Sequence, residues 1–148
     1  MKSTNSRNLD NELQKIINQN MSNNIIPSLL LHSCCAPCST YVLEYLSQFF
    51  SITIFYFNPN IYPKEEFNKR IDEQKTLISK MKFLNPVSFI GSEYSSERFY
   101  TAVRGLEDLK EGGERCFACY RLRLEETIKL AKEMNFDFFT TTLSISPY

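Results

Sequence analysis

The residues of this chain most able to do chemistry are its five cysteines, which fall into two tight groups. Cys34, Cys35 and Cys38 form the first group, and Cys116 and Cys119 form the second. A single free cysteine is commonly a small buried hydrophobic residue, but this explains two clusters of thiols poorly. An odd number of cysteines also argues against a closed set of disulfides. The pattern therefore indicates metal or redox chemistry.

Three kinds of chemistry fit these thiols. Soft thiolate ligands select zinc or iron–sulfur clusters, whereas magnesium and calcium prefer oxygen. The adjacent Cys34 and Cys35 cannot easily chelate one small tetrahedral ion together, which favours a cluster or two neighbouring metals. A structural zinc site is the plainer alternative, and thiol–disulfide exchange by Cys35 and Cys38 is the third. We expect an iron–sulfur redox site and keep the other two alternatives open.

Each cysteine group must be positioned by the elements next to it. The apolar run 29–32 is typical of a buried strand, and an apolar stripe predicts a helix over about 39–50, so the first group lies at a strand-to-helix junction. The second group opens a predicted helix over about 116–134, after a loop that contains Gly112 and Gly113. Helix N-termini stabilise thiolates, because their free N–H groups and their dipole favour negative charge.

The rest of the chain alternates between predicted strands and helices. Further strands are expected over 52–57, 87–90 and 137–143, and further helices over 63–82 and 95–104. This order favours an α/β domain over 29–148, with a mostly parallel sheet and helices on both faces. Residues 1–28 form a polar extension that is expected to hold one amphipathic helix. Ligands in such folds bind beyond the carboxyl ends of the strands, where both cysteine groups can meet.

Charge and hydropathy narrow the choice of partners and compartment. The chain has 17 basic and 17 acidic side chains, so no global field indicates a nucleic-acid or membrane partner. The N-terminus has no signal-peptide pattern, and no apolar run reaches the roughly 20 residues of a membrane span. We therefore expect a cytoplasmic protein without a membrane partner. Clustered cysteines in that reducing compartment are more often metal-binding or catalytic than disulfide-bonded.

Several motifs resemble one known family, the cobalamin-independent epoxyqueuosine reductases. They are LLHSCCAPCS at 30–39, NPNIYP at 58–63, GGERC at 112–116, CYRLRL at 119–124 and FTTTLSISPY at 139–148. The resemblance covers about residues 29–148. It implies reduction of epoxyqueuosine at the wobble position of tRNA, giving queuosine in the last step of queuosine biosynthesis.

The resemblance also implies cofactors and partners. The family uses a [4Fe–4S] cluster with an additional adjacent iron, and an external electron donor. Its fold resembles the nucleotide-binding α/β (HUP-like) domains, although this chain lacks their Ser-Gly-Gly-x-Asp-Ser loop, so ATP is not expected. The candidate cluster ligands are Cys34, Cys35, Cys116 and Cys119, and all five cysteines, Cys38 included, are candidate metal ligands. Family members usually continue several tens of residues further and carry a Cys-Gly-Cys, so a C-terminally incomplete domain is expected.

A few other polar residues are candidates for the site. His32, the only histidine, is a candidate catalytic proton donor near neutral pH, with a hydrogen-bonded core position as the alternative. The candidate substrate-binding residues are Asn58, Asn60 and Tyr62 after the clearest strand, and Arg115 and Arg121 beside the second cysteine group. Turn propensity or a solvated helix face would also explain these residues. Contact with tRNA phosphates is the functional interpretation of these two arginines and of the neighbouring Arg123.

Overall fold

The computed structural model describes residues 8–144 and contains one four-stranded sheet in that range. The strands are β1 (Ser28–His32), β2 (Ser51–Tyr56), β3 (Val87–Gly91) and β4 (Phe138–Thr141), in the order β3-β2-β1-β4. All three pairings are parallel, so the prediction of an α/β fold with a parallel sheet is confirmed. Likeness to the nucleotide-binding α/β domains stays a prediction.

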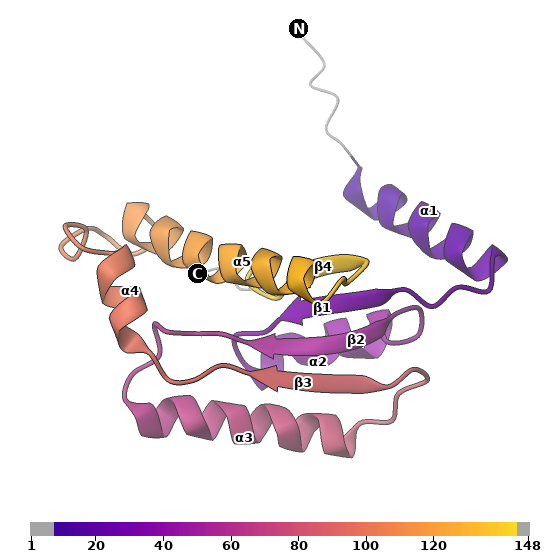
Figure 1. Cartoon of the computed structure of the whole chain (residues 1–148), viewed down its shortest axis with the longest axis horizontal. Coiled ribbons are helices and arrows are strands. Elements are labelled where there is room, and N and C mark those ends of the chain that lie inside the picture. Colours follow the sequence, from indigo (N-terminus) through magenta and orange to yellow (C-terminus); the bar gives the residue numbers. More distant parts are fainter. Residues whose placement is uncertain (1–7, 145–148) are drawn as a thin grey trace, which may run out of the picture.

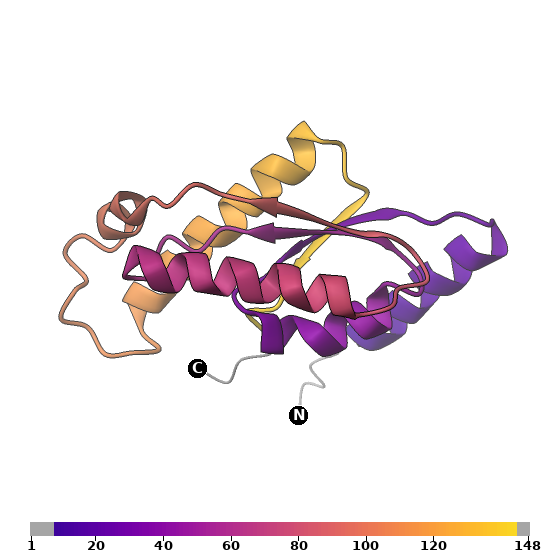
Figure 2. The same cartoon turned by 90° about the horizontal axis from the view of Figure 1, so that it is seen from below.

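Helices cover both faces of this sheet (Figure 1 and Figure 2). The helices α1 (Leu9–Ser22), α2 (Ala36–Leu46) and α3 (Lys64–Lys80) pack on one face, and α5 (Glu114–Glu133) packs on the other. The short α4 (Ser96–Ala102) lies beyond the carboxyl ends of the strands (Figure 1). Within residues 8–144, none of the helices has the length and apolar character that a membrane crossing requires.

The core has two layers because strand side chains alternate between the two faces. Leu29 and Leu31 of β1 belong to the layer under α1, α2 and α3, whereas Leu30 packs with Ala131 of α5. A strand that is buried on both faces reads as a continuous apolar run, which is why β1 and β2 were predictable. Ile17 of α1 is buried in the first layer, so this helix packs on the sheet domain. The division of the chain at residue 28 stays a prediction.

Both helices that carry cysteines begin earlier than predicted. Helix α2 starts at Ala36 with Pro37 in its first turn, and it ends at Leu46 instead of near residue 50. Helix α5 starts at Glu114. In both helices the apolar stripe begins only after the first turn, so the apolar pattern predicted a start that is too late. In α2 the first turn also contains Pro37, which fits there because the first turn needs no N–H from it. As a result, Cys38 and Cys116 lie inside the first turns of their helices.

The sheet order reverses next to β1. The chain passes from β1 to β2 and β3 on one side and then returns to place β4 on the other side of β1. In open parallel sheets this reversal marks the position where ligands bind, beyond the carboxyl ends of the two strands. Here those ends are followed by the first cysteine group and by Thr142.

A core substitution tests how α2 is anchored to the sheet. Leu43 of α2 has no exposed surface, so we expect Leu43→Ala to lower the free energy of unfolding by about 2–5 kcal/mol. The control is Leu84→Ala, at a side chain that is 79% exposed, where we expect a change within about 0.5 kcal/mol. Urea unfolding of the metal-free chain under anaerobic, reducing conditions measures both. Equal losses in the two variants would contradict the packing described here.

Candidate metal centre

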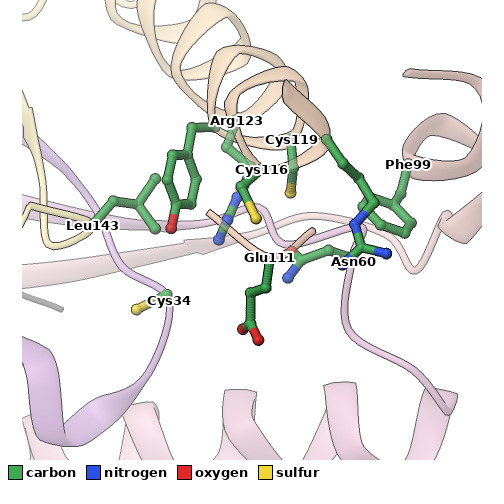
Figure 3. A pocket seen from close by; sticks show the side chains of 10 residues that line it. Cys34, Asn60, Phe99, Glu111, Cys116, Cys119, Arg123 and Leu143 are labelled. Carbon is green, nitrogen blue, oxygen red and sulfur yellow. The ribbon is translucent and has the colours of Figure 1, made fainter. Parts of the chain in front are cut away.

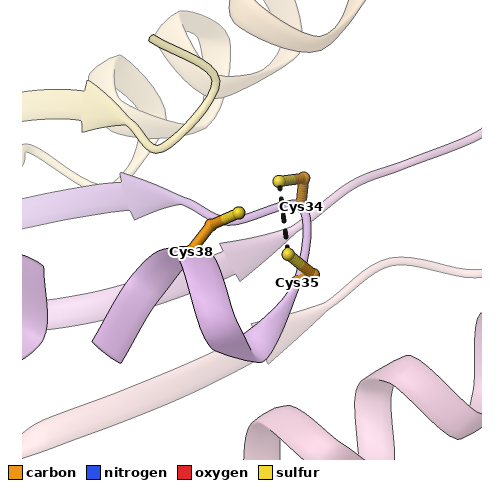
Figure 4. Close-up of side chains that lie close together, drawn as sticks. All are labelled: Cys34, Cys35 and Cys38. Atoms are coloured by element: carbon orange, nitrogen blue, oxygen red, sulfur yellow. Dashed lines mark hydrogen bonds between the residues drawn. The ribbon is translucent and has the colours of Figure 1, made fainter. Parts of the chain in front are cut away.

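The first cysteine group forms a compact set of three thiols. The Sγ atoms of Cys34, Cys35 and Cys38 all lie within 4.8 Å of one another, and those of Cys34 and Cys35 are 3.8 Å apart (Figure 4). Tetrahedral metal–sulfur bonds of about 2.3 Å place two sulfur ligands roughly 3.8 Å apart. The three thiols can therefore hold one metal ion. The expectation that adjacent cysteines avoid a common ion is not supported by this geometry.

The crowding of these thiols has an electrostatic consequence. The pKa of Cys38 is raised to about 12, first by its hydrogen bond with Cys35, then by burial and by the neighbouring thiols of Cys34 and Cys35. Three thiolates at this distance repel one another unless a cation lies among them. Metal ligands must be deprotonated, so a bound metal ion would supply that cation.

A buried polar network holds the loop that carries the first group. Gln74 of α3 is fully buried; its Oε1 accepts a hydrogen bond from Ser33 Oγ at 2.7 Å, and its Nε2 donates to Ser39 Oγ at 2.9 Å. On the other side, the backbone N–H of Cys34 donates to Thr142 Oγ1 at 3.4 Å. The loop is thus fastened to α3 and to the end of β4.

Cys34 of the first group and both cysteines of the second group line one cavity at the carboxyl edge of the sheet, whereas Cys35 and Cys38 are not among its lining residues (Figure 3). The cavity has a volume of about 340 Å³, roughly ten times the share of one water molecule in the liquid. Its lining residues are Cys34, Asn60, Phe99, Glu111, Arg115, Cys116, Cys119, Tyr120, Arg123 and Leu143. The prediction that both groups reach this edge is confirmed. The space exceeds what a single ion needs and suits a polynuclear cluster or a bound nucleoside.

The start of α5 and the loop before it fix the position of the second cysteine group. The backbone N–H of Gly112 donates to Cys116 Sγ at 3.2 Å, and Gly112 has a φ of +84°, a region that favours glycine. Cys119 is buried, which raises the pKa of its thiol, whereas the nearby Arg123 acts to lower it. Figure 3 shows both thiols on α5 at the cavity.

His32 is fully buried, and both of its ring nitrogens are engaged. Nε2 lies 2.9 Å from the carbonyl oxygen of Phe57, which can only accept, so Nε2 carries the proton and Nδ1 accepts from Thr141 Oγ1 at 3.0 Å. Burial is the main cause that lowers the pKa of His32 to about 4, so the ring is neutral near pH 7. Its bonds join the ends of β1, β2 and β4 and support a positioning role. The role of proton donor stays a prediction.

The other candidate residues take different positions around the cavity. Asn60 and Arg115 line it, and Asn60 Oδ1 is buried with no hydrogen-bond partner among residues 8–144. Asn58 is fully buried and donates from Nδ2 to the carbonyl oxygen of Ser33 at 2.9 Å, so its contacts are internal. Tyr62 is 72% exposed, and Arg121 is exposed outside the cavity. Substrate contact by these residues stays a prediction.

Two residues that contact the first cysteine group or its loop, Gln74 and Thr142, were missed from the sequence. Arg123 was considered only as a possible tRNA contact, together with Arg115 and Arg121. Arg123 had a usable signal, because Cys116, Cys119 and Arg123 are spaced three and four apart and so share one face of a helix. Arg121 falls on a different face. Thr142 had a weaker signal as the last residue of a threonine run at a strand end. Nothing local marks Gln74, which is 41 positions from its partner Ser33.

The fold and this site define a class: an α/β protein with a cysteine-rich candidate metal centre at the carboxyl edge of a parallel sheet. All five cysteines are free. Comparison with known families then gives a more specific result. The family model described as Epoxyqueuosine reductase QueH matches residues 29–148, and the chain belongs to this family.

Curated relatives agree with the family match. Proteins described as "Epoxyqueuosine reductase QueH" include one from Streptococcus pyogenes serotype M1 that is 41% identical over 143 residues, covering 95% of this chain and 56% of that protein. A relative from Staphylococcus epidermidis is 42% identical over 144 residues, covering 95% of this chain and 60% of that protein. A third, from Haemophilus influenzae, is 37% identical over 119 residues, covering 80% of this chain and 47% of that protein. The chain thus spans less than two thirds of these relatives' length.

A substitution in the buried network tests how the first cysteine group is held. Gln74→Leu removes the partner of Ser33 and Ser39, so we expect the free energy of unfolding to fall by about 1–3 kcal/mol. Loss of such supporting contacts typically weakens metal binding about 10–100-fold, which anaerobic titration with cobalt(II), followed by its thiolate absorption, would measure.

The matched control is Gln48→Leu, because Gln48 is exposed and bonds only to the backbone of its own segment among the described residues. We expect cobalt affinity in this variant to equal that of the unchanged chain. Equal affinities in all three proteins would contradict the supporting role of Gln74.

Proposed function

We propose that this chain reduces epoxyqueuosine at the wobble position of tRNA to queuosine. The observation that carries the proposal is the cavity lined by cysteines from both groups, in a chain that belongs to the QueH family. The relatives are described as epoxyqueuosine reductases, and that activity comes to this chain by inference.

The reaction balances with an external electron donor. Two C–O bonds of the epoxide break and a carbon–carbon double bond forms between the same two carbons. The oxygen leaves as water after it takes up two protons, and two electrons enter. Repeated turnover needs an external donor for the two electrons, and in this proposal a redox cofactor would relay them to the substrate.

The residues around the cavity fit a thiolate-bound cofactor. We assign Cys34, Cys35, Cys116 and Cys119 to a [4Fe–4S] cluster. Cys38, whose thiol lies within 4.8 Å of those of Cys34 and Cys35, is included among the ligands of an additional iron next to the cluster. When bound, the cluster would relay electrons and the additional iron would act as a Lewis acid toward the epoxide oxygen.

The chain's own residues would bind and orient the substrate. Asn60 lines the cavity, where its side-chain amide can hydrogen-bond to a nucleoside. The exposed ring of Tyr62 can stack on an unpaired anticodon base, the usual way in which proteins read RNA loops. The exposed Arg121 can contact a tRNA phosphate, and Arg115 lines the cavity beside Cys116.

A zinc-binding module is the second candidate, because the three thiols of the first group are close enough for one ion. It predicts a colourless protein that zinc stabilises. Thiol–disulfide exchange by Cys35 and Cys38 is the third candidate, and it predicts disulfide reduction that survives chelation.

Turnover tests the proposal directly. After anaerobic reconstitution with iron and sulfide, we expect the chain to convert epoxyqueuosine in tRNA to queuosine with dithionite as the electron source, measured by mass spectrometry of the nucleosides. Cys35→Ser and Cys119→Ser each remove a proposed cluster ligand, so each should lower the rate at least about 100-fold.

The zinc-loaded chain, assayed for queuosine formation, is the control for the metal. The chain treated with a chelator, assayed for reduction of a protein disulfide, is the control for dithiol chemistry. Neither should show activity. A fully iron-loaded chain that forms no queuosine would contradict the proposed function.

A charge substitution tests the proposed contact with tRNA. Removal of one phosphate contact by Arg121→Ala should weaken tRNA binding and reduce the slope of log affinity against log salt by about 1. Lys80→Ala is the control, because this exposed cation ends α3 at the opposite end of the sheet (Figure 1). Identical salt slopes for Arg121→Ala and Lys80→Ala would remove Arg121 from the interface.

A further inference from the structure

Arg123 is an unusual residue in this site because it is a buried cation. It lies on α5 one turn after Cys119, and only 5% of its surface is exposed. Arginine is rarely buried to this extent unless an anion pairs with it, because removing a charge from water is costly. Arg121, two residues earlier on the same helix, is exposed.

The partners of Arg123 among residues 8–144 are neutral. Its Nη1 donates to Asn58 Oδ1 at 3.3 Å, and its guanidinium lies 5.2 Å from the centroid of the Tyr120 ring. Its Nε is buried and has no hydrogen-bond partner within the described residues. The ion pairs within residues 8–144 join Lys69 to Glu73, Arg70 to Glu66 and Arg98 to Glu126, and none of them includes Arg123.

An anion that pairs with Arg123 would lie in the cavity that this residue lines. Arg123 lines it together with Cys34, Cys116 and Cys119, which come from both cysteine groups. The helical spacing places Arg123 on the same face of α5 as the two cysteines of the second group. These thiols become anionic when they bind metal, since metal binding releases their protons.

We propose that Arg123 is the built-in counter-charge of the thiolate-bound centre and raises its reduction potential. The proposal rests on the iron–sulfur centre of the proposed function. A cation next to the centre stabilises the reduced state, which carries one more negative charge, and net charge and hydrogen bonds to sulfur are known determinants of cluster potentials. A tRNA phosphate is a solvated surface group, for which the exposed Arg121 is better placed.

The direct test is the reduction potential of the reconstituted chain without tRNA, measured by anaerobic redox titration with EPR detection. Arg123→Gln should lower the equilibrium constant for one-electron reduction at least tenfold, which is a shift of about 59 mV to a more negative potential. Arg123→Lys should recover most of this shift. Arg121→Gln removes the same charge from an exposed position and should change the constant much less.

The metal-free chain separates a charge role from a structural role. An unpaired buried cation does not favour folding, so metal-free Arg123→Gln should unfold at the same urea concentration as the unchanged chain or at a higher one. A lower midpoint that Arg123→Lys restores would make Arg123 a structural residue and overturn the proposal. Loss of cluster uptake in Arg123→Gln with recovery in Arg123→Lys supports it, whereas loss in both variants overturns it.

Other outcomes are also decisive. If the unchanged chain takes up no iron–sulfur cluster, the proposed function and this inference both fail. If every variant takes up the cluster and Arg123→Gln has the potential of Arg121→Gln, the inference alone fails. Weaker tRNA binding by Arg123→Gln at an unchanged potential would assign Arg123 to the substrate and overturn the inference.

Discussion

The constraint on which the whole site depends is the parallel pairing of β1 with both β2 and β4. Because all strands run the same way, their carboxyl ends meet at one edge, and segments more than 100 positions apart become neighbours there. The imidazole of His32 fastens this edge, since it bonds to Phe57 after β2 and to Thr141 of β4. The loop of the first cysteine group starts directly from this fixed point.

Some buried polar groups near this edge have hydrogen-bond partners within the described residues and others do not, and the two sets have different roles. Ser33, Ser39, Gln74 and Asn58 are buried and bonded within the protein, as buried polar groups normally are. Asn60 and Arg123 line the cavity, and each has one buried polar atom, Oδ1 and Nε respectively, without a partner within residues 8–144. The bonded set holds the loop of the first cysteine group in position, and the other two side chains line the space that a bound group would occupy.

The sequence was sufficient for the fold class, since apolar runs marked the strands and their alternation with helices implied a parallel sheet. It also predicted that both cysteine groups reach the carboxyl edge of the sheet, because the carboxyl ends of parallel strands all lie at that edge. It could not separate Arg121 from Arg123, whose roles depend on helical phase relative to Cys119. The geometry does not support the expectation that adjacent cysteines avoid a common ion, because the chain turns from strand to helix at Cys35, the N-cap of α2, and the thiols of Cys34 and Cys35 are 3.8 Å apart.

The central claim is that both cysteine groups serve one iron–sulfur centre. Iron and acid-labile sulfide analysis with Mössbauer spectroscopy, after anaerobic reconstitution, tests it most directly when the unchanged chain is compared with the double variant Cys116→Ser, Cys119→Ser. The account predicts a cluster in the unchanged chain and no cluster in the double variant, in which the first group retains at most a single ion. A sulfide-free unchanged chain, or a double variant with its cluster intact, would contradict the account.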